Sequence, residues 1–413
     1  MAAPMNAPQP IDQEQRAPIG FVEFVALVAS LMALTALGID SMLPALPAIG
    51  TALGVASENE RQFVISSFLL GFGLAQLVHG PLADRYGRRP VLLIALAGYV
   101  VANLVAAFSS SFMLLLVARF ASGLAIAASR VVTVALVRDC YSGRAMARVM
   151  SLAFMVFMAA PVLAPSFGQL ILLFGSWRLI FVLIAVVSAG VLAWFAIRMP
   201  ETLAPERRHP LTIARLMADW RVTLTDRASI GYTLAATALL GALYGFINSV
   251  QQIVAALTGS DDLLVPVFIG VASMMALANL INSRIVIRLG TRRISHSALA
   301  AFIVLAGVHL VVAATGHETI WTFAILQSLA MACFGLASAN FSAMAMENMG
   351  AIAGTASSMQ GFITVTVGAV VGALIGQRFD GTTVPLYLGF FIASLIAFVI
   401  IAIVERGRMF RPS

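Results

Sequence analysis

The chain has 413 residues, of which 61% are hydrophobic and only 10% charged, against about 25% charged in ordinary soluble domains. All 25 basic residues are arginine, and with 18 acidic residues they leave a formal net charge of +7. The arginines are scattered between long apolar runs, which excludes the basic patch with stacking aromatics of a nucleic-acid-binding protein. Cysteines occur only at Cys140 and Cys333, which excludes a disulfide framework and a cysteine zinc site. The composition therefore predicts a polytopic membrane protein.

Apolar runs long enough to cross a bilayer as helices, about 20 residues each, recur between polar breaks along the whole chain. The alternating ten-residue segments of a β-barrel do not occur. We therefore expect an all-α integral membrane protein with twelve transmembrane helices. The expected spans are 21–43, 62–80, 90–110, 112–137, 147–174, 178–198, 230–257, 264–288, 295–314, 319–342, 352–377 and 384–404.

The arginine positions predict the orientation, because cytoplasmic loops of membrane proteins carry the basic excess. With the N-terminus inside, 20 arginines fall in cytoplasmic segments and 3 in outer loops. The remaining two, Arg119 and Arg130, lie within the fourth span. Both termini are therefore expected in the cytoplasm.

A long polar stretch between spans six and seven divides the chain into two similar halves. The turn after span two and the turn after span eight both contain Arg-x-Gly with a trailing Arg pair, and Gly87 and Gly290 are 203 residues apart. Two six-helix pseudo-repeats of this kind are the parallel-repeat design of some transporters, which hold substrate between the halves. The expected segments are a cytoplasmic tail 1–20, a six-helix bundle 21–198, a linker 199–229, a second bundle 230–404 and a tail 405–413.

The turn after span two carries the most specific motif in the sequence, Gly80-Pro81-Leu82-Ala83-Asp84-Arg85-Tyr86-Gly87-Arg88-Arg89-Pro90. It resembles the signature of the major facilitator superfamily between helices two and three. The resemblance implies that Gly80, Asp84, Arg85, Gly87, Arg88 and Arg89 form a cluster that latches the cytoplasmic side and gates the conformational change.

Further motifs resemble the drug:proton antiporter branch, and within it the multidrug exporters of the Bcr/CflA type. Span one ends in Gly38-Ile39-Asp40-Ser41-Met42-Leu43-Pro44-Ala45-Leu46-Pro47, and span four contains Arg119-Phe120-Ala121-Ser122-Gly123. Span five contains Pro161, Pro165 and Gly168, which are similar to the antiporter motif. The fuller motif has a glycine before the second proline and a second glycine at its end, and both are absent here. The resemblance covers residues 20 to 405. It implies a bacterial inner-membrane protein.

Asp40, Arg119 and Arg130 are the charged residues well inside the predicted spans, where charge is costly and usually functional. Asp40 is the expected proton carrier, and Arg119 is expected at similar depth, where it would modulate the protonation of Asp40. The alternative interpretations are a wetted aspartate at a helix end and a purely structural arginine.

Arg130 departs from the subfamily pattern. It follows Arg119 by eleven residues, so the two side chains share a helix face about 16 Å apart. Arg130 either binds an anionic or zwitterionic group of the substrate or extends toward the cytoplasm and Asp139.

The other expected substrate-binding residues are flexible thioethers and polar groups on central spans. In span five they are Met155 and Met158, and in span seven Tyr244, Asn248, Gln251 and Gln252. Such amides also simply join helices. Asn279, Asn282 and Gln360 are weaker candidates. Gly368, Gly372 and Gly376 recur every four residues, which predicts a close helix-packing face.

The leading hypothesis is proton-coupled export of hydrophobic small molecules by alternating access, performed by a monomer. It requires a small-molecule substrate, protons and the lipid bilayer, and no cofactor, metal or nucleic acid. A second hypothesis keeps the fold and makes the substrate a polar metabolite such as an amino acid, nucleoside or sugar. An enzyme is not favoured, because no His/Asp/Glu cluster is present, and no ring of like charges indicates a channel.

Overall fold

The computed structural model describes residues 17–208 and 212–410, and every regular element in this part of the chain is helical. The long helices are α1 (Phe21–Asp40), α3 (Phe63–Tyr86), α4 (Arg88–Ala107), α5 (Phe112–Cys140), α6 (Gly143–Phe174), α7 (Arg178–Arg198), α9 (Arg227–Thr258), α10 (Leu264–Leu289), α11 (Thr291–Ala314), α12 (Ile320–Ala345), α13 (Ala353–Gly376) and α14 (Val384–Val404). The shorter elements are η1 (Leu43–Ala45), α2 (Leu46–Ala52), η2 (Asn59–Gln62), η3 (Pro205–Arg207), α8 (Ile213–Thr225) and η4 (Gly350–Ile352).

Among the described residues, eleven helices are long and apolar enough to cross a membrane, with α1 and α2 counted together and η2 counted with α3. The twelfth crossing is α6, whose described apolar part is Val162–Phe174. The predicted all-helical fold with twelve spans is therefore confirmed.

The first span is interrupted where its sequence places two prolines. Proline lacks a backbone N–H and clashes with the preceding helical turn, so α1 ends at Asp40 and the chain restarts twice. Pro44 lies in η1 and Pro47 at the beginning of α2. This break places the Asp40 carboxyl at a helix end within the membrane protein rather than in the middle of a continuous helix.

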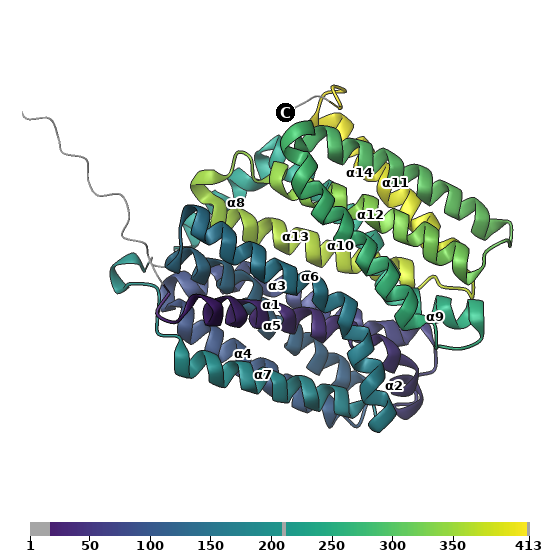
Figure 1. Ribbon diagram of the computed structural model, residues 1–413, viewed down its shortest axis with the longest axis horizontal. Helices are drawn as coiled ribbons and strands as arrows, with labels where there is room; N and C mark the ends of the chain where they lie inside the picture. Colours follow the sequence, from purple (N-terminus) through teal and green to yellow (C-terminus); the bar gives the residue numbers. More distant parts are fainter. Residues whose placement is uncertain (1–16, 209–211, 411–413) are drawn as a thin grey trace, which may run out of the picture.

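The crossings form two six-helix halves, α1–α7 and α9–α14, which lie one above the other in Figure 1. The halves contact each other mainly through α3 against α13 and through α6 against α10. These are the second span against the eleventh and the fifth against the eighth, so exchanging the halves reproduces the same pairings. That symmetry is what a tandem repeat of six-helix units predicts.

The segment between the halves differs from its sequence-based description as a polar linker. It contains α8, and α9 already begins at Arg227. The α8 residues contact α13 and α9. The linker therefore folds against the second half.

The glycine repeat of α13 packs against α9. A Cβ atom at Gly372 would lie 2.9 Å from the backbone nitrogen of Gly245, and one at Gly368 would lie 3.5 Å from that of Gly241. The predicted close-packing face is confirmed for these two glycines.

Candidate functional site

A cavity of about 1190 Å³ lies between the two halves. Its walls come from α1, α3 and α5 of the first half and from α9, α12 and α13 of the second, with α8 at its edge. It reaches the end of the molecule that carries the Gly80–Arg89 turn, since Asp84, Arg88 and Arg138 line it there. A chamber between pseudo-repeats is where transporters of this design bind substrate.

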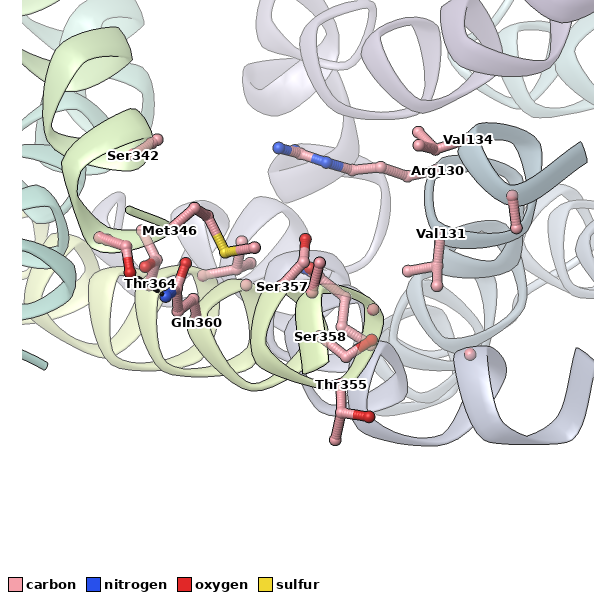
Figure 2. A pocket seen from close by; sticks show the side chains of 18 of the residues that line it. Arg130, Val131, Val134, Ser342, Met346, Thr355, Ser357, Ser358, Gln360 and Thr364 are labelled. Carbon is pink, nitrogen blue, oxygen red and sulfur yellow. Dashed lines mark hydrogen bonds between the residues drawn. The ribbon is translucent and has the colours of Figure 1, made fainter. Parts of the chain in front are cut away.

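Two of the main predicted substrate-binding residues line this cavity, Arg130 and Tyr244, and so does Gln360 of the weaker candidates. Arg130 is exposed on α5, and Figure 2 shows its side chain extending across the cavity toward the half that carries Ser342 and Met346. Asp139, the partner considered for Arg130, bonds Arg88 at 3.0 Å instead. The structure therefore places Arg130 in the cavity.

The remaining predicted substrate residues do not line the cavity: Met155, Asn248, Gln251, Gln252 and the weaker candidates Asn279 and Asn282. Gln251 donates to Asp261 at 2.8 Å, and Asn248 accepts from Ser66 at 3.5 Å. Met155 is 54% exposed and does not line the cavity. The side chain of Met158 lies outside the described residues. Asn248, Gln251 and Gln252 belong to the far part of α9, beyond the cavity.

Four amide side chains close the end of the molecule opposite the Gly80–Arg89 turn, and we call them the amide cluster: Asn59, Gln62, Gln252 and Gln377. Gln62 donates to Gln252 at 2.5 Å and to the Gly376 carbonyl at 3.0 Å. Gln252 donates to Asn59 at 2.9 Å, and Gln377 donates to the Asn59 carbonyl at 2.6 Å. Each of these bonds joins the first half to the second.

Asn59, Gln62 and Gln377 were missed in the sequence, as was Gln76 on the cavity wall. The signal that marks them is an uncharged amide at the end or inside of a strongly apolar span, where each unpaired polar group is costly. Because amides also join helices without any role in transport, that signal does not separate a gate from a packing contact.

Asp40 and Arg119 are both buried near the closed end, with Asp40 5% exposed and Arg119 fully buried. Arg119 donates to the Val64 carbonyl at 3.0 Å and to the Gly38 carbonyl at 2.7 Å. Its guanidinium lies 4.4 Å from the centroid of the Phe68 ring. The predicted proximity of spans one and four is confirmed by the bond to Gly38, two residues before Asp40.

No ion pair joins Asp40 and Arg119 among the described residues. Asp40 Oδ1 and Arg119 Nη1 are both buried without a hydrogen-bond partner in that part of the chain. Arg119 instead satisfies two carbonyl oxygens, which costs less than leaving them unpaired in an apolar interior. In this conformation the arginine fixes the backbone around Asp40 and leaves its carboxyl free.

The region of the predicted antiporter motif packs closely on this same part of α1. A Cβ atom at Gly168 would collide with the Ser41 carbonyl oxygen, so only glycine allows α6 to lie this near. Pro165 is buried in α6, and the side chain of Pro161 lies outside the described residues. Gly168 thereby supports the chain directly after Asp40.

The Gly80–Arg89 turn forms a cluster at the open end of the cavity. Gly87 has φ 105°, which favours glycine. The Glu201 carboxylate accepts hydrogen bonds from the backbone N–H groups of Arg88 and Arg89 at 2.9 and 3.1 Å. Arg88 also bonds Asp84 at 2.5 Å and Asp139 at 3.0 Å. The turn therefore ties together the ends of α3, α4, α5 and α7 within the first half.

The two remaining members of the motif differ in their contacts. Arg89 donates to the Met199 and Ala196 carbonyls at 2.8 and 2.9 Å, fastening α4 to α7. Arg85 is exposed and stacks on Tyr86, with its guanidinium 5.1 Å from the ring centroid. Gly80 packs beside Ser358 of α13, at the junction of the halves.

The second half repeats this arrangement with different residues. Gly290 has φ 79°, and Arg292 bonds Glu347 and Glu405, each at 3.0 Å. Burial raises the pKa of the Glu405 carboxyl, but hydrogen bonds from Tyr232 and Arg292 outweigh it and hold that pKa below its usual value. Glu201 and Glu405 follow the last spans of their halves and are 204 residues apart. The faint sequence repeat therefore corresponds to a repeated charge cluster.

Comparisons with known proteins agree with this architecture. Residues 28–373 match the family model of the Major Facilitator Superfamily. The chain is 31% identical to a bicyclomycin resistance protein homolog of Haemophilus influenzae, over 88% of this chain and 91% of that one. It is 28% identical to the multidrug resistance protein MdtL of Klebsiella pneumoniae, over 94% and 96% of the two chains.

A solved structure shares the fold at low sequence identity. The human organic anion transporter MFSD10 superposes with a TM-score of 0.67 at 18% identity, over 92% of this chain and 99% of that one. The family and these relatives are transporters rather than enzymes. The motifs, the paired halves and the family match together show that the chain belongs to the major facilitator superfamily, with relatives named for drug resistance.

Proposed function

We propose that this protein is a proton-coupled antiporter that exports hydrophobic small molecules across the bacterial inner membrane by alternating access. The observation that carries the proposal is the cavity between the halves, which is open at the end of the Gly80–Arg89 turn and closed by the amide cluster at the other. A chamber accessible from one side only is one of the two states that alternating access requires.

The orientation of the molecule sets the direction of this access. The arginine-rich end faces the cytoplasm under the positive-inside rule, with both termini on that side. The cavity then faces the cytoplasm, and the amide cluster closes the outer side. Substrate enters from the cytoplasm, and opening of the amide cluster releases it outside.

Asp40 is the proton carrier in this proposal. Its carboxyl is buried without a hydrogen-bond partner among the described residues, an environment that favours the neutral, protonated form. Opening of the outer end would hydrate the carboxyl and allow Arg119 Nη1, which also lacks a described partner, to turn toward it. Proton uptake and release by Asp40 are thereby linked to the opening of the outer end.

The protein needs no cofactor in this scheme, because the proton gradient supplies the energy, and it acts as a monomer. Relatives named for resistance to bicyclomycin, chloramphenicol and several drugs support drug-like substrates. A polar metabolite is the second candidate substrate, favoured by the polar side chains of the cavity wall, among them Gln76, Ser342 and Thr364.

Growth inhibition measured over a panel of antibiotics, with and without expression of the protein, separates these candidates. We expect raised inhibitory concentrations for several apolar compounds and loss of this resistance in Asp40→Asn at equal expression. Resistance to no compound would overturn the drug-export proposal and favour the metabolite.

A further inference from the structure

The charged residues of the cavity wall differ in whether they have partners. Arg88 lines the cavity but bonds Asp84 and Asp139. Arg130 lines it with no ion pair and no hydrogen bond to any residue that the structure describes. Its side chain is exposed to the cavity (Figure 2).

The depth of Arg130 makes this lack of a partner significant. It follows Phe112, the first residue of α5, by 18 residues and precedes Cys140, the last, by ten, which are about 27 and 15 Å along a helix axis. The bilayer core is about 30 Å thick, so Arg130 lies within the membrane span, in the part nearer the Gly80–Arg89 turn. Charges at this depth are costly and normally pair with another group. The guanidinium is therefore arranged for a partner that arrives in the cavity.

A second unpaired donor lies on the same cavity wall. Gln76 of α3 is 4% exposed, and its Nε2 is buried without a hydrogen-bond partner among the described residues. It precedes Gly80 by one helical turn, and Gly80 packs beside Val131, the neighbour of Arg130. Both unsatisfied groups are N–H donors, and a guanidinium accepts no hydrogen bond. Together they are suited to an oxyanion.

The rest of the nearby wall is mainly apolar or neutral. The apolar side chains come from both halves: Val131, Val134, Leu240, Phe334 and Met346. The described acids of the lining are Asp84, which Arg88 pairs, and Asp219 on α8. Arg138 and Arg215 also line the cavity at its open end, and this basic entrance attracts anions from the cytoplasm.

We infer that the substrate is an amphiphilic organic anion, whose carboxylate or sulfonate group binds the Arg130 guanidinium with the Gln76 amide as a second donor. Its apolar body packs against the valines of α5 on one side and Leu240, Phe334 and Met346 on the other. This inference rests on the proposed transport function and narrows its substrate class. Neutral compounds still fit the apolar walls, but they leave Arg130 unpaired.

The test is direct binding of two probes that differ in charge and little in shape, naphthalene-2-sulfonate and the neutral naphthalene-2-sulfonamide. Titration calorimetry on the full-length protein in lipid nanodiscs, corrected with empty nanodiscs, measures both affinities. A charge-assisted hydrogen bond predicts that the sulfonate binds about tenfold to a hundredfold more tightly than the sulfonamide. Arg130→Gln is expected to abolish this preference and to leave sulfonamide binding within about twofold of wild type, since the apolar walls are intact.

Arg138→Gln is the matched control, because it removes the same charge from the open end of the same cavity. It is expected to keep the sulfonate preference. Arg130→Lys keeps the charge but loses the bidentate hydrogen-bonding geometry of the guanidinium, so a smaller preference for the sulfonate is expected. This variant provides the test if Arg130→Gln fails to fold. Equal affinity of wild type for the two probes, or an unchanged preference in Arg130→Gln or Arg130→Lys, would overturn the inference.

The two proposals fail separately in this design. If the wild-type protein exports neutral drugs when driven by protons and does not prefer the sulfonate, the anionic substrate class is overturned and the antiport function stands. A preference that depends on Arg130, in a protein that exports nothing when a proton gradient is imposed, supports the anion site and overturns the antiport function.

Discussion

Replacing Gln252 with alanine removes two hydrogen bonds that join the halves at the closed end. Gln252 accepts from Gln62 at 2.5 Å and donates to Asn59 at 2.9 Å. Each such bond contributes about 0.5–1.5 kcal/mol net, so the closed state loses about 1–3 kcal/mol relative to a state with this end open. At about 1.4 kcal/mol per factor of ten, the ratio of open to closed molecules rises roughly 5-fold to 150-fold.

Distances between spin labels on the two halves measure this ratio. Cys140 and Cys333 are first replaced by serine and alanine, and labelled cysteines are introduced at Thr51 and Thr315, both exposed at the closed end. Pulsed electron resonance then gives the distance distribution in nanodiscs. We expect Gln252→Ala to add or enlarge a component at longer distance.

Gln251→Ala is the matched control, because this neighbouring amide bonds Asp261 within the second half and does not cross between the halves. It is expected to leave the distribution unchanged. The assignment of the amide cluster as a gate is refuted if Gln252→Ala leaves the long-distance component unchanged, or if Gln251→Ala enlarges it equally.

Three further substitutions test the packing around the site by thermal unfolding of the purified protein. Gly87→Ala is expected to lower the free energy of unfolding by about 1–3 kcal/mol, because φ 105° strains any residue with a Cβ atom. Gly98→Ala is the control and is expected to be tolerated, because its Cβ would meet only the Ala125 Cβ at 3.7 Å. Equal unfolding midpoints of the two variants would contradict this expectation. Glu201→Gln removes the negative charge that accepts the first backbone N–H groups of α4, and it is expected to lower the free energy of unfolding by about 0.5–2 kcal/mol. The exposed Glu206→Gln is the control and is expected to leave the unfolding midpoint unchanged. In Arg119→Lys a single ammonium group replaces the planar guanidinium and cannot bond the Val64 and Gly38 carbonyls at the same time. This substitution is expected to lower the free energy of unfolding by about 1–3 kcal/mol. An unchanged unfolding midpoint would show that these two bonds contribute nothing to stability.

The transmembrane helices could be predicted from the sequence because their signal is local. Runs of apolar residues exceed the bilayer thickness, and the Gly80–Arg89 turn is specific enough to imply the family. The prolines at 44 and 47 also indicate the interruption after Asp40, although the predicted span 21–43 extends three residues past the end of α1. Helix α8 was missed, because a short amphipathic helix among charged residues looks like a polar linker.

The candidate site was predicted only in part, because its geometry depends on which helix ends meet and in which conformation. Arg130 and Tyr244 line the cavity as expected. Gln252 lies instead in the amide cluster, whose other members are distant in sequence and come together only when the halves close at that end. Arg119 was expected at the depth of Asp40, where it would modulate the protonation of that carboxyl, but the carbonyl oxygens of Gly38 and Val64 compete for its guanidinium. The sequence does not show which of these partners prevails.

The proposal that Asp40 is the proton carrier is tested most directly by transport in proteoliposomes containing Asp40→Asn. Uphill accumulation and exchange of substrate are measured on the same preparation. Uphill accumulation requires the imposed pH gradient, whereas exchange of labelled for unlabelled substrate requires only that the cavity reorient with substrate bound. We predict that Asp40→Asn loses accumulation driven by the gradient and retains exchange, because its amide stands for a permanently neutral carboxyl. Accumulation by Asp40→Asn at the wild-type level, with the same dependence on the pH gradient, would contradict the account.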